Sequence, residues 1–454
     1  MAPASMPSHG ISLSGATRVW AYIGLNSFGG PAGQISVMHR ELVETRHWIS
    51  ERRFLHALNY CMVLPGPEAQ QLATYVGWLM HGVRGGVIAG SLFVIPGFVA
   101  MLALSIGYAV LGEVPLVSGL LFGLQAAVVA IVVQAAIRIG RRTLRSPALV
   151  LVATCSFLAI ALVNVPFPAI IAVAGLFGWL AGRVRPRWLP LGGRPDEPRS
   201  ERPALLADDE RVDRATALRA FRAALVALAL WLVPVLALAL ALGTEHVLTQ
   251  EAFLFSKAAV VTFGGAYAVL GYVAQQAVDR YGWVTPQDMM VGLGLAETTP
   301  GPLIMVVQFV GFLAAYNNPG DLPPVVAGVL GSVVTVWVTF VPCFLFIFLG
   351  APFVERLRDN DALRHALTAV GAAVTGVVLD LALWFAMNTV FGSVQDRSYG
   401  PFVVPVPDLS SIQWASVGLS VLAAVLVFRF RLGTLKVLAV IAGLGAALAV
   451  AGVT

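Results

Sequence analysis

The chain has few charged residues, and lysine is almost absent. Only 12% of its 454 residues are Asp, Glu, Lys or Arg, 58% are hydrophobic, and Lys257 and Lys436 are the only lysines. Because an ordinary soluble domain carries about 25% charged residues, this composition argues against a soluble protein and predicts a membrane protein. The chain also lacks a basic stripe with interleaved aromatic residues, which argues against nucleic acid as a partner.

Cysteine and the common catalytic patterns are scarce as well. The three cysteines lie far apart in apolar segments, so neither a disulfide framework nor a CxxC metal site is predicted. The histidines form no HExxH spacing, and no GxGxxG follows a predicted strand. We therefore expect no metal, no cofactor and no enzymatic activity. The amino terminus lacks a charged region followed by a continuous apolar stretch, so we also expect no cleavable signal peptide.

Long apolar stretches make up most of the chain. A membrane helix needs about 20 apolar residues, and such windows occur at residues 87–111, 115–137, 224–243, 324–350, 367–391, 413–430 and 437–452. Shorter or interrupted ones occur at 18–38, 54–80, 148–163, 167–182, 252–278 and 289–316. The pattern predicts an all-α polytopic protein that crosses a bacterial inner membrane several times.

One sequence unit occurs twice. The segment "SFGGPAGQI" from Ser27 is echoed by "TFGGAYAVL" from Thr262, and "LPGP" from Leu64 is echoed by "TPGP" from Thr299. The offsets agree, since 262−27 and 299−64 both equal 235. Further along, proline 96 best matches proline 342, an offset of 246. A fixed offset between separate landmarks indicates internal duplication.

Equivalent loops of the two copies carry opposite charge. The loop 39–53 holds four arginines, whereas its counterpart 274–288 holds one arginine beside two aspartates. Cytoplasmic loops are enriched in Lys and Arg, so the copies are predicted to lie in opposite orientations, as in many secondary transporters. We expect a first repeat at 1–182, an Arg/Pro-rich cytoplasmic linker at 183–222, a connecting transmembrane helix at 223–251 and a second, inverted repeat at 252–454.

Proline and glycine interrupt the apolar segments at matched places. Residues 54–80 are too short for two spans and are predicted to enter and return as re-entrant half-helices, broken at "LPGP". The FGG segments either re-enter or form single kinked spans. Pro67 and Pro302 are expected to open half-helices whose free N–H groups point inward and favour an anion. The alternative is that these prolines only kink packed helices, but matched breaks in two repeats favour a midplane site.

Polar groups near these breaks form the predicted site. We assign substrate binding to the breaks, their polar neighbours and one lysine: Gly29, Gly30, Pro65, Gly66, Pro67, Gln70, Gln71, Lys257, Gly264, Gly265, Thr298, Thr299, Pro300, Gly301 and Pro302. Proton coupling is assigned to Glu68 and Glu297, because ionisable residues at membrane depth are functional candidates. Two structural alternatives stay open, namely a Lys257–Glu297 ion pair and a Glu68 that only caps its own half-helix.

The same stretches resemble the chromate transporter family in its long, two-domain form. The resemblance lies in "GLNSFGGPAGQISVMHRELVE", "LPGPEAQQLATYVGWLMHG", "GSLFVIPG", "KAAVVTFGGAYAVL" and "AETTPGPLIMVVQFVGF". It implies an inner-membrane exporter of chromate, a sulfate analogue, driven by the proton motive force and conferring chromate resistance. An importer or exchanger of sulfate or another tetrahedral oxyanion has the same physical features and stays open, as does a homo-oligomer.

Overall fold

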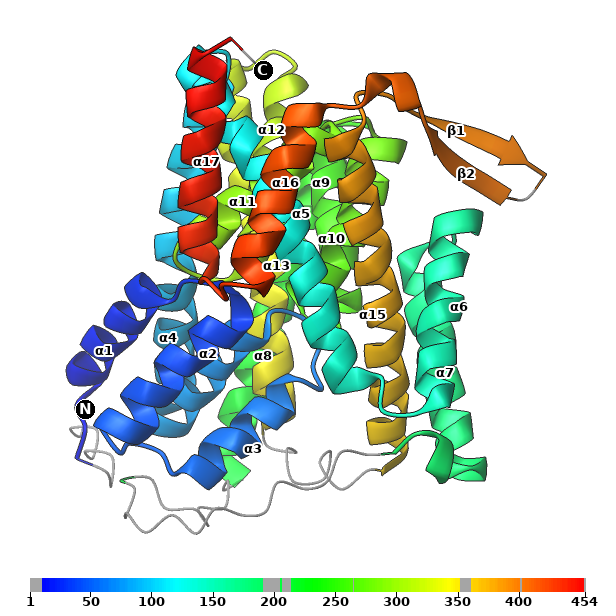
Figure 1. Cartoon of the computed structure of the whole chain (residues 1–454). Coiled ribbons are helices and arrows are strands. Elements are labelled where there is room, and N and C mark those ends of the chain that lie inside the picture. The colour runs from blue at the N-terminus through cyan, green and yellow to red at the C-terminus, as the bar shows by residue number, and fades with distance from the viewer. Residues whose placement is uncertain are drawn as a thin grey trace.

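Helices dominate the structure, a computed structural model that describes residues 10–190, 205, 214–263, 265–351, 361–400 and 402–452 (Figure 1). In this part of the chain six helices are long and apolar enough to cross a membrane: α4 (Glu68–Leu111), α5 (Pro115–Thr143), α7 (Phe167–Val184), α8 (Arg214–Leu242), α13 (Pro324–Gly350) and α15 (Asp361–Val390). Shorter apolar helices include α6 (Pro147–Val163), α12 (Val306–Asn317), α16 (Trp414–Phe428) and α17 (Thr434–Val450). The chain is an all-α polytopic membrane protein, as its composition predicts.

One β-hairpin departs from this all-helical pattern. Strand β1 (Val394–Tyr399) pairs antiparallel with β2 (Phe402–Pro407), and a 3-10 turn, η6 (Leu409–Ser411), follows. The hairpin lies at the upper right in Figure 1. A search for helix-length apolar windows does not detect it, because each strand is only six residues long.

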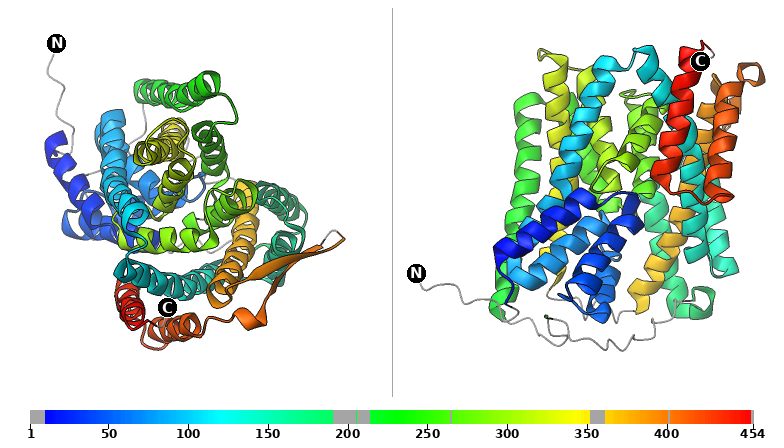
Figure 2. Two further views of the ribbon diagram at one scale, coloured as in Figure 1. Left: turned by 90° about the horizontal axis from the view of Figure 1, so that it is seen from above. Right: turned by 60° about the vertical axis from the view of Figure 1, so that its left-hand side comes forward.

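The first FGG segment forms a re-entrant hairpin. Helix α1 (Leu13–Asn26) rises from the lower face towards the middle, and α2 (Gly30–His39) returns (Figures 1 and 2). Gly29 and Gly30 between them have φ values of 80° and 73°, a region that glycine adopts without a steric penalty. Of the two arrangements that the sequence allows for this segment, the structure has the re-entrant one.

A second re-entrant hairpin follows, built from α3 (Glu51–Cys61) and the first part of α4. Helix α4 is two helices joined by a tight turn, since His81 and Gly82 have non-helical dihedral angles. Gly77 and Gly85 pack so closely that a Cβ on Gly77 would lie 2.5 Å from the Gly85 carbonyl oxygen, so the chain reverses direction here. Residues 54–80 therefore enter and return, as their length predicts, and only the remainder of α4 spans the membrane.

The second half passes through the same order of elements. A short π-helix, η1 (Arg40–Thr45), recurs as η3 (Gln275–Arg280), and 275−40 and 280−45 both equal 235. A hydrogen bond of 2.8 Å from Trp48 N to Leu42 O recurs at 2.8 Å from Trp283 N to Ala277 O. The remaining re-entrant elements of this half are α9 (Val247–Val261), α10 (Ala266–Ala274), α11 (Pro286–Thr298), η4 (Leu303–Met305) and α12. They lie in the upper half of Figure 1, whereas α1, α2 and α3 lie in the lower half.

The change of offset from 235 to 246 has a structural cause. In the first half the two parts of α4 are joined by the turn at His81 and Gly82. In the second half α12 ends at Asn317 and α13 begins at Pro324, so a longer connection stands in place of that turn. The connection, residues 318–323, supplies six of the 11 extra residues (246−235), and the other five lengthen the start of α13.

The last two helices of each half pack against the long helix of the other half. Helices α6 and α7 lie on α15, and α16 and α17 lie on α5 (Figure 1). Glycines allow the close approach: a Cβ on Gly178 would lie 2.6 Å from the His365 carbonyl oxygen, and one on Gly123 would lie 2.3 Å from that of Ile441. Small residues at such crossings are typical of packed membrane helices.

Helix α8 differs from the predicted connecting segment 223–251. It begins at Arg214 and ends at Leu242, and α9 already starts at Val247. The helix begins earlier because polar turns that contain Arg219 and Arg222 precede its apolar part, and a hydropathy window leaves such turns out. Helix α7 ends at Val184, two residues beyond the predicted end of the first repeat. Most of the predicted linker, residues 191–204 and 206–213, lies outside the described residues.

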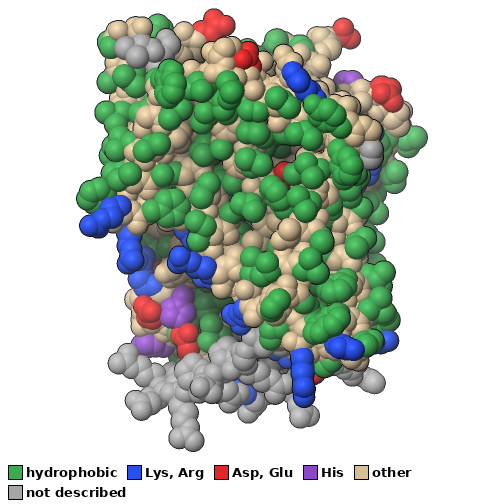
Figure 3. Space-filling view, turned by 45° about the vertical axis from the view of Figure 1, so that its right-hand side comes forward, with side chains coloured by type: hydrophobic (Ala, Val, Ile, Leu, Met, Phe, Trp, Pro, Cys, Tyr) green, Lys and Arg blue, Asp and Glu red, His purple; other side chains and the backbone are tan. Residues whose placement is uncertain are grey.

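Charge is distributed unevenly between the two ends of the molecule. Figure 3 shows hydrophobic side chains over most of one face, with most Lys and Arg side chains in its lower half. Asp and Glu side chains mark the upper rim and a small patch at the lower left. By the positive-inside rule, this distribution predicts that the lower end of Figure 1 faces the cytoplasm.

Candidate oxyanion site

Each Pro-Gly-Pro break contacts the FGG segment of the opposite half. Gly66 N donates a hydrogen bond of 2.8 Å to Thr262 O, and Gly301 N donates one of 2.9 Å to Ser27 O. Gly301 matches Gly66 and Thr262 matches Ser27, since 301−66 and 262−27 both equal 235. The two hydrogen bonds are therefore the same contact, formed once from each half to the other. Ser27 and Thr262 are buried, so each contact lies in the interior.

The same two glycines touch the long helices of the opposite half. A Cβ on Gly66 would lie 2.9 Å from Cys343 Sγ in α13, and one on Gly301 would lie 3.2 Å from Gly97 Cα in α4. Cys343 and Gly97 are again matched, because 343−97 = 246. With φ values of 117° and 89°, Gly66 and Gly301 hold a conformation that other residues rarely adopt.

Four helices begin beside these two contacts. Helix α2 and η4 start next to the Gly301 contact, and α4 and α10 start next to the Gly66 contact. None of these four starts has a side-chain cap, whereas Ser50 and Thr285 cap α3 and α11. Helix α10 also packs against η4, which brings the two groups of helix starts together. Uncapped helix N-termini offer free N–H groups and a positive partial charge, the features that bind anions.

The polar side chains predicted to face the anion instead donate hydrogen bonds within their own half of the protein. Gln71 Nε2 donates to Pro65 O at 2.6 Å, and Gln70 Nε2 donates to Thr74 Oγ1 at 3.1 Å. The hydroxyl groups of threonines 298 and 299 donate to carbonyl groups of their own helix. In this conformation the free donors at the breaks are therefore backbone N–H groups rather than these side chains.

One buried amide at the site was not predicted. Gln34 Nε2 donates to Gly301 O at 2.6 Å, so both backbone polar groups of Gly301 are bonded to the opposite half. Gln34 lies on α2, one turn after Gly30, and is 2% exposed. Its presence in the repeated segment "SFGGPAGQI", at a position where the second copy has Val269, is the signal that could have identified it.

Glu297 lies where the resemblance and the sequence place it, close to a break. It is 2% exposed near the end of α11, and the Tyr267 hydroxyl donates a hydrogen bond to its Oε1. Tyr267 is the second residue of α10, so the carboxyl group lies at the start of that helix. Glu68 is the first residue of α4, and no hydrogen bond or ion pair involves its carboxylate in the described part of the chain.

Lys257 does not lie among the buried groups at the breaks. It is exposed, and among the described residues no carboxylate is within ion-pair distance of it, so the Lys257–Glu297 pair is not formed. Neighbouring positions on a helix are about 100° apart, and α9 buries Ala258 while Lys257 points away. Gly264 lies outside the described residues, and Gly265 has a φ of 101°.

Two arginines lie near the glutamates, where lysine was expected to provide cationic charge. Arg138 attracts Glu297 electrostatically, and Arg142 attracts Glu68. The two arginines are one helical turn apart near the C-terminal end of α5, and both are exposed. The sequence shows the two arginines only as part of a basic stretch. The fold places this end of α5 near both glutamates.

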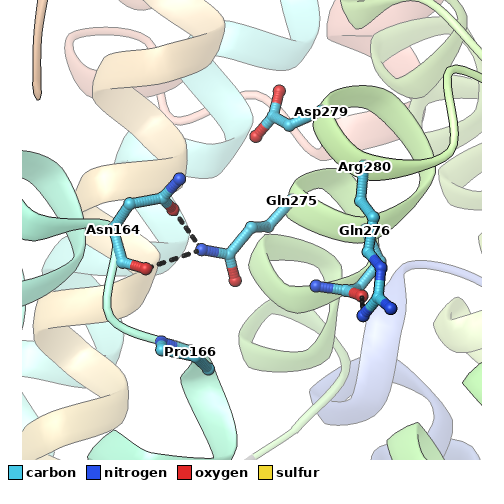
Figure 4. A pocket seen from close by; sticks show the side chains of 6 residues that line it. All are labelled: Asn164, Pro166, Gln275, Gln276, Asp279 and Arg280. Atoms are coloured by element: carbon cyan, nitrogen blue, oxygen red, sulfur yellow. Dashed lines mark hydrogen bonds between the residues drawn. The ribbon is translucent and has the colours of Figure 1, made fainter.

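A cavity of about 260 Å³ lies elsewhere, between the α6–α7 turn and η3 (Figure 4). Its lining residues are Asn164, Pro166, Gln275, Gln276, Asp279 and Arg280. The carboxyl group of Asp279 interacts with those of Asp380 and Asp396. Three carboxyl groups near one guanidinium disfavour a dianion there. Among the described residues no group of three or more His, Cys, Asp or Glu side chains could hold a metal ion.

Comparison with known proteins identifies the family. The family model described as chromate transporter matches residues 16–179 and 249–450, and these two regions contain the two halves of the fold. The chain belongs to the chromate transporter family. A relative in this family, the chromate transport protein of Pseudomonas aeruginosa, is 34% identical over 366 residues, which cover 79% of this chain and 78% of that protein.

Other relatives are more distant. The chromate transport protein of Cupriavidus metallidurans is 26% identical and covers 81% of each chain. An uncharacterized transporter of Methanocaldococcus jannaschii is 24% identical over 80% of this chain and 82% of its own length. No solved structure matches the chain. Membership of the chromate transporter family, together with the apolar helices, confirms a multi-pass membrane protein.

Proposed function

We propose that this chain exports chromate, a tetrahedral dianion and sulfate analogue, and that the proton motive force drives the export through its membrane-potential component. One observation carries the proposal: the crossed contacts of Gly66 with Thr262 and of Gly301 with Ser27 bring four uncapped helix starts together in the interior. Backbone N–H groups and helix dipoles suit an oxyanion that must be bound without water and then released. Membership of the chromate transporter family supports chromate as that oxyanion.

We further propose that the two halves are inverted copies, the first ending with α7 and the second beginning with α9, joined by the linker after α7 and by the connecting helix α8 (Arg214–Leu242). Each contact joins a break of one half to an FGG segment of the other. A rocking movement of one half against the other would therefore change both contacts at once, as expected for alternating access around a fixed site. No catalytic step is needed for this activity.

Arg138 and Arg142 are proposed to collect the anion at the cytoplasmic end. Replacing both with glutamine should raise the KM for chromate about tenfold at low salt, because each exposed charge contributes about 0.7 kcal/mol of attraction. The difference from the wild type should shrink at high salt, since exposed charges are screened. Initial transport rates at several chromate concentrations give the KM. Arg145→Gln is the matched control and should leave the KM unchanged; an equal effect there would contradict a specific role for the pair.

Glu297 and Glu68 are proposed to carry the coupled proton. A carboxylate close to a bound dianion repels it unless a proton neutralises the carboxylate, so binding of chromate and binding of a proton favour each other. A dianion that moves with one proton carries a net charge of −1. Outward movement of that charge is favoured by a membrane potential that is negative inside, at about 2.3 kcal/mol per charge for 100 mV.

Chromate uptake into everted vesicles tests the proposal. A lumen-positive potential, imposed with potassium and valinomycin, should drive accumulation, and so should a lumen more alkaline than the medium. Excess sulfate tests selectivity. Absence of chromate uptake in vesicles that contain folded protein would reject export. Uptake of sulfate or molybdate instead, or transport only in right-side-out vesicles, would favour the alternative of an importer or exchanger of another tetrahedral oxyanion.

A further inference from the structure

A fully buried carboxyl group, Glu251, lies outside the site described above. It belongs to the second turn of α9 and has an exposure of 0%. Its side chain reaches the crossing of α12 and α13, where a Cβ on Gly331 would lie 3.1 Å from Glu251 Oε1 and 2.4 Å from Gly311 O. The sequence places Glu251 at the edge of an apolar window, next to the polar residues that precede α9, so the local pattern does not indicate its burial.

Neither carboxyl oxygen of Glu251 has a hydrogen-bond partner. The Thr335 hydroxyl lies close to the carboxyl group, but the two do not have hydrogen-bond geometry. Thr335 Oγ1 and the neighbouring Ser332 Oγ are themselves buried and without partners. Several oxygen atoms thus meet at one helix crossing with no hydrogen bond among them. Burying an ionised carboxylate in such a place is strongly unfavourable.

No charged group from the packed helices offsets Glu251. Helix α9 packs against α8, α10, α12 and α13. The ionisable residues on these four helices are Arg214, Arg219, Arg222, Tyr267, Tyr272, Tyr316 and Cys343. The arginines lie in the first turns of α8, at the end remote from its connection to α9. On the chain around α9 itself, Glu245 and His246 precede the helix, and Lys257 points to its exposed side.

We propose that Glu251 is a proton-binding site separate from the oxyanion site, and that it takes up and releases a proton as α9, α12 and α13 rearrange during transport. A proton removes the charge at the crossing without needing space. A dry metal ion such as Ca²⁺ or Mg²⁺ would need about six oxygen ligands, more than this crossing provides. The proposal that Glu251 exchanges its proton during transport rests on the proposed function, because it requires a transporter. The proposal that Glu251 binds a proton does not depend on that function.

The first experiment measures proton binding without transport. Glu251→Gln imitates the protonated carboxyl group, so the variant and the wild type should unfold at the same temperature in acid. As the pH rises, ionisation of Glu251 stabilises the unfolded wild type, because the carboxyl group is then in water. In the folded wild type the same ionisation would bury a charge. The unfolding temperature of the wild type should therefore fall relative to that of the variant. Glu245→Gln, which changes an exposed carboxyl group, should follow the wild type throughout. Unfolding curves of wild type and Glu251→Gln that stay parallel from about pH 5 to about pH 9 would overturn the proposal, since each pH unit changes the ratio of ionised to protonated carboxyl tenfold.

The second experiment measures proton release during turnover. In chromate exchange without any gradient, the wild-type rate should differ at least about fivefold between about pH 6 and about pH 8, and Glu251→Gln should reduce this ratio to the smaller pH dependence that Glu297 and Glu68 leave. Thr335→Val, which keeps the carboxyl group, should retain a pH-dependent rate. An unchanged ratio in Glu251→Gln would overturn the proton exchange, and stabilisation of the wild type but not of Glu251→Gln by Na⁺ would replace the proton with a metal ion. If the wild type moves no chromate, the proposed function fails, while the unfolding experiment still decides whether Glu251 binds a proton.

Discussion

Replacing Gly301 with alanine should reduce chromate transport at least about 30-fold, because a non-glycine residue at such a φ costs about 2 kcal/mol. Gly301 has a φ of 89°, and its Cα faces Gly97 of α4 so closely that a Cβ would lie 3.2 Å from the Gly97 Cα. To relieve the strain, the break would have to move away from the opposite half. The Gly301 N–H bond to Ser27 would lengthen, and the start of η4 would leave its place beside α2. Initial rates of chromate uptake in vesicles measure the effect.

Two further variants make this result specific. Gly66→Ala places the same strain on the matched break and should produce a loss of similar size, since Gly66 has a φ of 117° and contacts Cys343. Gly107→Ala is the control, because Gly107 lies in the spanning part of α4 with no atom within 4 Å of an added Cβ. Full transport by folded Gly301→Ala protein would show that the break geometry is not required.

Replacing Glu297 with glutamine should reduce the rate of chromate transport driven by a pH gradient at least about tenfold. Transport driven by a membrane potential should persist. Glutamine cannot take up or release a proton, so the variant would move chromate as a dianion and carry a net charge of −2 instead of −1. The potential at which net flux stops, measured at a fixed chromate gradient, should therefore halve relative to the wild type. That expectation follows directly from the free energy of moving a charge across the membrane.

Tyr267→Phe is the companion variant for Glu297. It removes the hydroxyl group that donates to Glu297 Oε1 but keeps the carboxyl group, so the pH gradient should still drive transport, with a shifted pH dependence. Glu245→Gln changes an exposed acid and should behave as the wild type does. Transport by Glu297→Gln that still follows the pH gradient at the wild-type rate would exclude Glu297 as the proton carrier and direct attention to Glu68.

Much of the architecture is readable from the sequence because membrane helices leave strong signals. Apolar windows mark the spans, and the short segment between residues 54 and 80 requires re-entry. The repeated landmarks at an offset of 235 also predict which positions are matched, and Gly66 and Gly301 are matched in the structure. The sequence does not predict that each break contacts the other half, because a repeat offset says which positions correspond and nothing about which ones touch.

The misplacements within the site have physical causes. Lys257 was assigned to the site from its place in the sequence near an FGG segment, but one helical step of 100° turns it to the exposed side of α9. The sequence shows Arg138 and Arg142 only as part of a basic stretch, because their relation to the glutamates depends on how α5 packs across the halves. Glu251 was missed because its burial comes from the crossing of α12 and α13, which no local pattern encodes.

The most direct test of the central claim is the position of bound chromate in a density map of the protein in a lipid nanodisc. The account predicts density in the interior, within hydrogen-bond distance of the backbone N–H groups that begin α2 and η4 or α4 and α10. The same density should be absent in a Gly301→Ala map recorded under identical conditions. Density in the cavity beside Asn164 and Arg280, with the helix starts empty, would contradict the account.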